Sequence, residues 1–400
     1  FCLMQPLPIY LDNNATTACD PRVLETMLPY FTTQYGNAAS RSHSFGWVAE
    51  EAVDYAREQV AALIGAVKQE IVFTSGATEA VNLAIKGVAE TYAATGNHII
   101  TAVTEHKAVI DTCRRLEQKG CQVTWLPVNE EGLVAVEDIA AAITPQTILI
   151  AIMYANNETG VIQPVKAIGE LAKERNILFF CDATQAVGKI PVNVLEDGID
   201  LLACSAHKLY GPKGVGALYV RRKGPRVRLT AQIDGGGHER GMRSGTLNVP
   251  GIAGFGKACE ICGEEMASEA LRLGGLRDHL ETSLLRLEAS RRNGSNVHRL
   301  PHTTNISLNY LEGQTLIMSF SKQIALSSGS ACTSASMEPS YVLKAMGLDD
   351  TLARNALRMG VGRFTTREEI DFAIDTITHA VLEMRKISPQ WEAYKSGLAQ

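Results

Sequence analysis

The chain has 400 residues, 46% of them hydrophobic and 20% charged, which is typical of a globular protein with a large core and room for two domains. A formal net charge of −5 gives no electrostatic basis for direct binding to nucleic acid or to an anionic membrane. The densest apolar run, 147–155, is too short to span a bilayer. The start carries no signal-peptide pattern and the nine cysteines are an odd number, so we expect free thiols in a reducing cytoplasm.

Apolar runs alternate with amphipathic stretches from about Val53 onward. They predict strands at 71–74, 98–103, 123–126, 147–152, 177–181 and 201–204, and helices at 78–88, 108–119, 136–142 and 165–175. This alternation predicts an α/β fold with a large, doubly wound, mostly parallel sheet covered by helices on both faces. Residues 214–220 predict one more strand, antiparallel and at an edge. Sheets of this kind bind ligands beyond the carboxyl ends of their strands.

The pattern changes after about Gly251. A long stretch rich in Ala, Glu, Leu and Arg, interrupted at Gly274–Gly275, predicts helices that lead into a smaller α+β domain. There we expect strands at 305–309, 324–328 and 357–361, and helices at 314–322, 340–346 and 367–385. The boundary falls near 255–265. We therefore expect an N-terminal segment, 1–20, packed on the small domain, a large domain at 21–260 and a small domain at 261–400.

One strand-to-helix turn, Phe-Thr-Ser-Gly-Ala-Thr-Glu at 73–79, has the small residues of a phosphate site. The first N–H groups of a helix have no partner within the helix, and they attract anions. A plain N-cap by Ser75 is at least equally consistent with this pattern. The Thr78 hydroxyl would face a phosphate or cap the helix.

Two further strand ends carry reactive side chains. Asp182 ends an apolar strand, where it could bind a metal, orient a base, pair with a protonated ring nitrogen or simply form a loop. The next strand leads into Ser-Ala-His-Lys-Leu-Tyr-Gly-Pro-Lys-Gly at 205–214. A lysine there can form a Schiff base if burial lowers its pKa. Lysine, aspartate and a phosphate-binding turn together indicate pyridoxal 5'-phosphate, although spacing does not distinguish Lys208 from Lys213.

The cysteines allow two interpretations. Cys332 lies in the Ser- and Gly-rich stretch 327–334, which predicts an exposed loop thiol more readily than a packed one. Cys259 and Cys262 have the spacing of a metal or redox pair. No second Cys or His pair stands at ligand spacing, so packed thiols are favoured and no resident metal is expected.

Taken in order, these motifs resemble the class I, NifS/IscS-like cysteine desulfurases. These belong to fold-type I of the pyridoxal-phosphate enzymes, in the class-V aminotransferase superfamily. The resemblance runs from Tyr-Leu-Asp-Asn-Asn-Ala-Thr-Thr at 10–17 to about Trp391. Besides the segments above, its matching pieces are 36–37, 40–43, 104–106, 156–160 and 235–246.

The resemblance implies a role for each residue around the cofactor ring. Lys208 would form the Schiff base, Asp182 would keep the pyridine nitrogen protonated and Gln185 would bond the phenolic oxygen. His106 would stack on the ring and assist proton transfer. The phosphate would be held by Ala77, Thr78, Ser205 and His207, with Thr246 from a second subunit.

The resemblance also implies the substrate and its fate. Asn157 would contact cofactor and substrate, and Arg358 would clamp the carboxylate of L-cysteine. The Cys332 thiolate would take the sulfur as a persulfide and leave L-alanine. Acceptors would be iron–sulfur scaffold proteins, with which Cys332 would transiently ligate a cluster, or tRNA thiolation factors. We expect a cytoplasmic homodimer with shared active sites and no direct nucleic-acid or membrane partner.

The sequence departs from the family pattern in two places. It is also compatible with three other classes of function, which different measurements distinguish. Met359-Gly360 replaces the usual aromatic residue and serine after Arg358, and the sequence ends at 400 without the short tail that docks the scaffold. A selenocysteine lyase or a lyase releasing sulfide needs no persulfide thiol. An inactive scaffolding subunit would not form alanine, and a metalloprotein built on Cys259 and Cys262 would contain metal.

Overall fold

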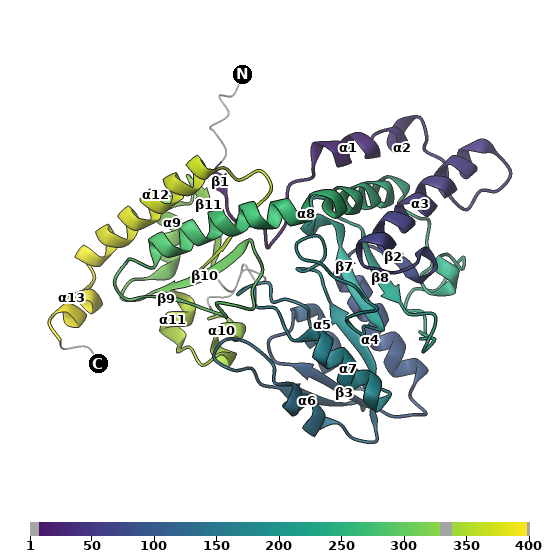
Figure 1. Ribbon diagram of the computed structural model, residues 1–400, viewed down its shortest axis with the longest axis horizontal. Coiled ribbons are helices and arrows are strands. Elements are labelled where there is room, and N and C mark those ends of the chain that lie inside the picture. The colour runs from purple at the N-terminus through teal and green to yellow at the C-terminus, as the bar shows by residue number, and fades with distance from the viewer. Residues whose placement is uncertain (1–7, 329–337, 398–400) are drawn as a thin grey trace.

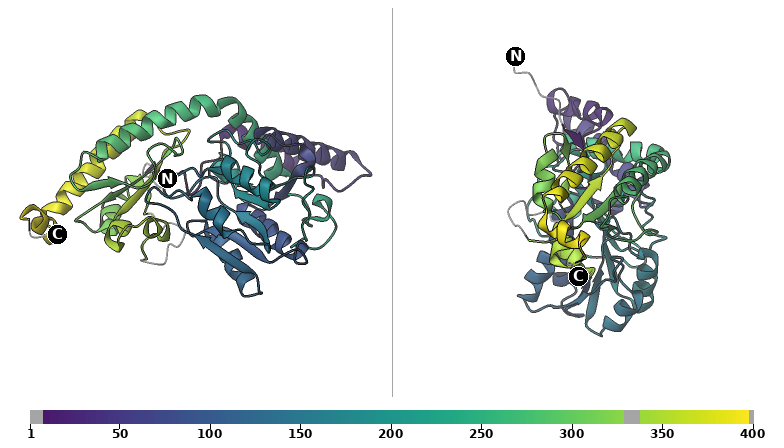
Figure 2. Two further views of the ribbon diagram at one scale, coloured as in Figure 1. Left: turned by 60° about the horizontal axis from the view of Figure 1, so that its bottom comes forward. Right: turned by 90° about the vertical axis from the view of Figure 1, so that its left-hand side faces the viewer.

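The computed structural model describes residues 8–328 and 338–397, so Cys332 and most of its predicted loop lie outside the described residues. Two parts lie side by side, and one long helix, α8 (Val249–Leu284), crosses from the larger to the smaller (Figures 1 and 2). No helix in the described part of the chain is both long and apolar enough to cross a membrane.

The larger part is built on a seven-stranded sheet. Its spatial order is β2 (Ile71–Thr74), β8 (Gly216–Val220), β7 (Leu201–Ser205), β6 (Leu178–Asp182), β5 (Thr147–Ala151), β3 (His98–Ala102) and β4 (Gln122–Leu126). Only β8 is antiparallel to its neighbours, which confirms the mostly parallel sheet. The edge position expected for β8 is wrong. A short connection returns β8 beside β7 as its antiparallel neighbour, and β2 then pairs on its outer side.

Helices cover both faces of this sheet. On one face lie α4 (Ala77–Thr91) and α5 (Lys107–Glu117); on the other lie α3 (Ser44–Leu63), α6 (Val136–Ala142), α7 (Val165–Arg175) and the first half of α8. In α5 the buried Val109, Cys113 and Leu116 recur at helical spacing and face the sheet. The strands between the two layers are buried on both sides, which explains their continuous apolar runs.

The smaller part contains an antiparallel sheet in the order β12 (Ser327–Ser328), β13 (Ala356–Gly360), β10 (Thr303–Leu308) and β9 (Ser290–Arg292). The second half of α8, α9 (Gly313–Phe320) and α12 (Arg367–Lys386) cover it. The N-terminal strand β1 (Ile9–Tyr10) pairs with β11 (Ile324–Ala325), and Leu11 enters the same core. The remaining described α-helices are α1 (Pro21–Met27), α2 (Pro29–Thr32), α10 (Tyr341–Ala345), α11 (Asp350–Arg354) and α13 (Pro389–Lys395).

The interruption expected at Gly274–Gly275 is wrong, because α8 continues through both glycines. Each glycine costs a helix roughly 1 kcal/mol relative to alanine. Leu273, Leu276 and Leu280 recur along one side of α8 and are buried in the small-domain core, and this packing outweighs the low helix propensity of glycine. Since α8 contributes to both cores, the exact domain boundary remains a prediction.

Candidate active site

A cavity of about 580 Å³ lies at the carboxyl ends of the sheet strands. β2 runs in the same direction as β7, since both are antiparallel to β8, so β2, β3, β5, β6 and β7 all end at this edge. The cavity is lined by ten residues predicted for the site: Ala77, Thr78, His106, Asn157, Asp182, Gln185, Ser205, His207, Lys208 and Arg358. Thr246 is exposed and does not line it. Cys332 is outside the described residues.

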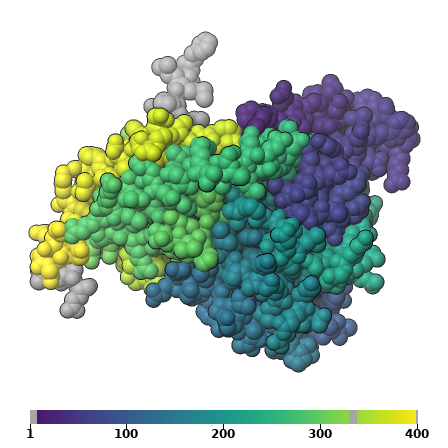
Figure 3. Space-filling model, viewed as in Figure 1, coloured from purple at the N-terminus to yellow at the C-terminus, as the bar shows by residue number. Residues whose placement is uncertain are grey.

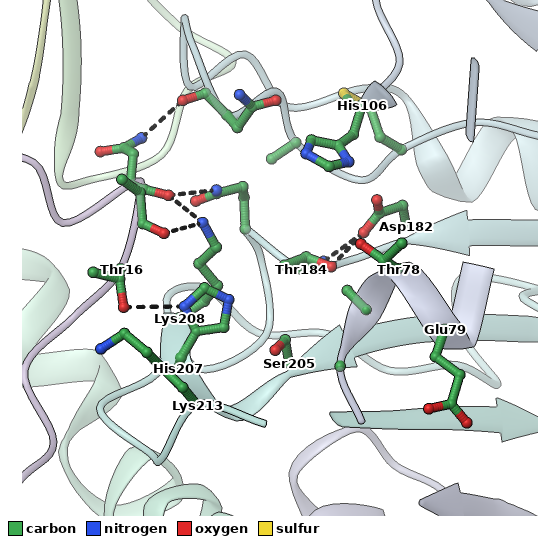
Figure 4. Close-up of a pocket in the computed structure, with 18 of the residues that line it drawn as sticks. Thr16, Thr78, Glu79, His106, Asp182, Thr184, Ser205, His207, Lys208 and Lys213 are labelled. Atoms are coloured by element: carbon green, nitrogen blue, oxygen red, sulfur yellow. Dashed lines mark hydrogen bonds between the residues drawn. The ribbon is translucent and has the colours of Figure 1, made fainter. Parts of the chain in front are cut away.

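Lys208 reaches the middle of the cavity from the short turn Ala206–Lys208 that follows β7 (Figure 4). Its Nζ donates to the main-chain oxygens of Asn14 at 2.5 Å and Ala15 at 2.6 Å. Lys213 lines the same cavity, but it is exposed to solvent. This geometry favours Lys208 as the amine that meets a buried ligand.

Asp182 and Gln185 reach the same space from the end of β6 and the turn after it, and His106 reaches it from the start of α5. Figure 4 shows Asp182 and His106 there. Asp182 is 6% exposed, and its Oδ1 accepts hydrogen bonds from the main chain and hydroxyl of Thr184 at 3.1 and 2.5 Å. The His106 Nδ1 accepts from the Ala108 N–H at 3.1 Å, which fixes the ring at the start of α5. Burial lowers the pKa of His106, so the ring is neutral at pH 7 and carries its proton on Nε2.

The phosphate-binding turn starts helix α4, where Gly76 is the N-cap residue. The alternative N-cap by Ser75 is wrong: no side chain caps the helix, and Ser75 instead donates its N–H to Glu79 Oε2 at 2.7 Å. Gly76 has φ 155°, and a Cβ on Gly216 would lie 2.7 Å from the Gly76 Cα. The turn therefore needs glycine at both positions, and it presents the first amides of α4 to the cavity.

Ser205 and His207 line the cavity too, and a Cβ on Gly76 would lie 3.8 Å from Ser205 Oγ. The His207 Nδ1 is 3.1 Å from the Thr16 hydroxyl. Burial, with added repulsion from Lys208 and Lys213, lowers the pKa of His207 to about 4. The imidazole is therefore neutral at pH 7 and can contribute a hydrogen bond, but no full charge, to an anion.

Arg358 lines the cavity from β13 of the smaller part and is only 2% exposed. Its Nη2 pairs with Asp12 Oδ1 at 2.7 Å, and its Nη1 donates to the main-chain oxygen of Asn157 at 3.3 Å. Its Nε is buried and has no hydrogen-bond partner in the part of the chain that the structure describes. A buried guanidinium with a donor to spare suits a ligand carboxylate.

The sequence patterns assign no role to Asn14, although it contacts three of the predicted residues, Lys208, Gln185 and Asn157. Its main-chain oxygen accepts from Lys208 Nζ and from Gln185 Nε2, the latter at 3.0 Å. Its Nδ2 donates to Thr303 Oγ1 at 2.8 Å and to the Asn157 oxygen at 3.3 Å. The only signal was its place in the matched segment 10–17. No local pattern indicates that this segment lies against Lys208.

Gly360 packs against the Asn14 side chain. We expect Gly360→Ala to lower the free energy of unfolding by roughly 1–3 kcal/mol, because the added methyl group would be too close to that side chain. A Cβ at position 360 would lie 1.9 Å from Asn14 Oδ1. Urea unfolding measures the effect. The control is Gly275→Ala in α8, where a Cβ meets nothing within 4 Å and stability should rise by up to about 1 kcal/mol. Unchanged stability of Gly360→Ala would show that Asn14 moves aside freely.

Glu158 should make stability fall as pH rises. Burial raises the pKa of its carboxyl from 4.5 to about 7, against the opposing effects of the Ser340 hydroxyl at 2.5 Å and of Arg358. The folded protein then binds more protons than the unfolded chain between about pH 4.5 and 7, so stability decreases through that window. Glu158→Gln stays neutral, and its stability relative to the native protein should increase by about 3 kcal/mol across it.

Urea unfolding of the two proteins at several pH values between 4.5 and 8 measures this difference. Glu281→Gln is the control, because hydrogen bonds from Arg299 and Thr304 lower the pKa of Glu281 despite its burial. The difference in free energy of unfolding between Glu281→Gln and the native protein should stay constant over this pH range. A constant difference for Glu158→Gln as well would mean that Glu158 titrates normally.

Comparison with known proteins identifies the family. The family model "Aminotransferase class-V" matches residues 9–372. Cysteine desulfurase IscS of Pasteurella multocida is 58% identical over 98% of this chain and 97% of its own length, and that of Anaeromyxobacter dehalogenans is 56% identical with the same coverage. A solved NifS-like protein superposes with a TM-score of 0.88 at 39% identity, over 94% of this chain and 100% of its own. The expected fold class is thus confirmed, and the chain belongs to the cysteine desulfurases of the class-V aminotransferase family, which are pyridoxal-phosphate enzymes.

Proposed function

We propose that this chain removes the sulfur of L-cysteine, leaves L-alanine and carries the sulfur as a persulfide on Cys332. The observation that carries the proposal is the meeting of Lys208, Asp182 and Arg358 in one cavity at the carboxyl edge of the sheet. The amine of Lys208 can bind the cofactor aldehyde, the carboxylate of Asp182 can pair with the ring nitrogen, and the guanidinium of Arg358 can bind the substrate carboxylate.

The residues present fit pyridoxal 5'-phosphate. The glycine-lined start of α4 suits its phosphate, and Asp182, whose Oδ1 is held by Thr184, can pair with a ring N–H. When bound, the cofactor supplies an electron sink. Lys208 would hold the aldehyde and then move the substrate α-proton, and the neutral His106 would lie over the ring. Asn157 and Arg358 would orient the amino acid by its carboxylate.

The sulfur transfer itself would belong to Cys332. Its thiolate attacks the substrate sulfur, a new S–S bond forms and the Cβ–S bond breaks, with the electron pair remaining on the carbon side. Protonation of that carbon gives alanine. The persulfide would then pass to iron–sulfur scaffold proteins, with Cys332 transiently ligating a cluster, or to tRNA thiolation factors.

We further propose a cytoplasmic homodimer with shared active sites, in which Thr246 reaches the partner's phosphate turn. Apolar side chains exposed on the α1–α3 region support this, because a surface so apolar is typical of an interface. This region forms the end of the molecule away from the small domain (Figure 3). The exposed side chains are Leu24, Leu28, Phe31, Tyr35, Phe45, Trp47, Val48 and Tyr55.

The test is to supply L-cysteine to the cofactor-loaded protein without a reductant and to measure alanine together with the mass of the peptide that contains Cys332. We expect one alanine per subunit and one added sulfur atom on that peptide. Free sulfide with pyruvate and ammonia in place of alanine, and an unmodified peptide, would indicate a lyase that releases sulfide by β-elimination. The absence of alanine, pyruvate and sulfide would indicate an inactive, scaffolding subunit.

A further inference from the structure

Asp12 is fixed between two strands of the small domain. The residue before it, Leu11, donates its N–H to the Ala325 oxygen at 2.8 Å and accepts from the Gly360 N–H at 2.7 Å. Asp12 itself forms a bridge with Gly360. The backbone therefore fixes Asp12 beside β13, the strand that carries Arg358.

The Asp12 carboxylate makes two side-chain hydrogen bonds within the described residues. Oδ1 pairs with Arg358 Nη2 at 2.7 Å, and Oδ2 accepts from the Ser327 hydroxyl at 2.9 Å. A guanidinium that is 2% exposed needs a counter-ion, since an unpaired buried charge is strongly destabilising. Asp12 supplies it, and the pair carries almost no net charge.

Arg358 lines the cavity and nevertheless retains N–H groups that these contacts do not use. Of its five N–H groups, Asp12 and the Asn157 oxygen each accept from one, and Nε is buried with no hydrogen-bond partner among residues 8–328 and 338–397. A ligand carboxylate bound there would be the second anion on one cation. Two carboxylates that share a site repel each other, and burial strengthens this repulsion.

We propose that Asp12 is a positioning residue that competes with the amino-acid carboxylate for Arg358 and so limits how tightly the site holds substrate and L-alanine. This inference rests on the proposed function, in which Arg358 clamps that carboxylate. Arg358 paired with Asp12 binds the carboxylate of an amino acid less tightly than Arg358 without a counter-ion would. The product, L-alanine, therefore leaves more readily.

The experiment measures L-alanine binding to the cofactor-loaded protein by calorimetry, with ethylamine as the matched probe that lacks a carboxylate. Asp12→Asn keeps hydrogen-bonding groups and removes the charge. It should tighten L-alanine binding about tenfold and leave ethylamine binding within twofold. Asp12→Ser also removes the charge with a smaller side chain, and it should give the same result if the asparagine variant does not fold.

Ser327→Ala is the control, because it removes the second contact of Asp12 but keeps its charge. L-alanine binding should then be unchanged or weaker, and never tighter. Unchanged or weaker L-alanine binding in the folded Asp12 variants would overturn the inference and leave the proposed function intact. A native protein that binds L-alanine no better than ethylamine would overturn the carboxylate clamp, and with it both proposals.

Discussion

Lys208→Ala is expected to slow alanine formation from L-cysteine by about 10⁴-fold or more and to abolish covalent attachment of the cofactor. The variant loses the nucleophilic amine and the proton carrier together, and a positioned general base alone contributes roughly 10²–10⁴-fold. The side chain lies beside Asn14 and Ala15 at the centre of the cavity, where no other described lysine reaches as deeply. Initial rates and the absorption spectrum of the cofactor-loaded protein measure both effects.

The matched control is Lys213→Ala. Lys213 lines the same cavity from the same loop, but its side chain is exposed, so its loss should change the rate by less than about tenfold. Borohydride reduction followed by peptide mapping locates the attached lysine independently of activity. Attachment that survives in Lys208→Ala, or disappears in Lys213→Ala, would reverse the assignment that spacing alone could not make.

The large sheet was predictable because its strands are buried on both faces. A strand in this position is a continuous apolar run, and such runs located β5 at Thr147–Ala151 and β7 at Leu201–Ser205 to within a residue. The edge that carries the site followed from the same pattern. Asp182 is the last residue of β6, and Lys208 lies in the short turn after the neighbouring strand β7; parallel strands end at one edge.

The parts that could not be predicted depend on contacts between distant segments. Asp12 and Asn14 follow a strand of two residues, and they reach Arg358 and Lys208 only because that strand pairs with β11. The inner position of β8 depends on which strand β2 joins. The continuity of α8 depends on leucines packed in a core that its own sequence does not show. In each case tertiary packing overrides the local pattern.

Cys332→Ala is expected to abolish the persulfide and to slow alanine formation by at least about 10²-fold, because the substrate sulfur then has no thiolate to accept it. Exchange of the α-proton of L-alanine with solvent should continue, since Lys208 and the other cavity residues remain. Mass spectrometry of the cysteine-treated protein and proton exchange in heavy water separate the two halves of the reaction. Loss of both would mean that Cys332 supports the fold or the cofactor instead.

The other cysteines make poor substitutes. All seven in the described part have a thiol pKa raised chiefly by burial, which leaves little thiolate at neutral pH: Cys19, Cys113, Cys121, Cys181, Cys204, Cys259 and Cys262. Of the nine cysteines, only Cys2 and Cys332 lie outside that part, so Cys2→Ala is the decisive control. It should keep full persulfide formation. A persulfide that disappears with Cys2 and survives without Cys332 would move the nucleophile to the N-terminal segment.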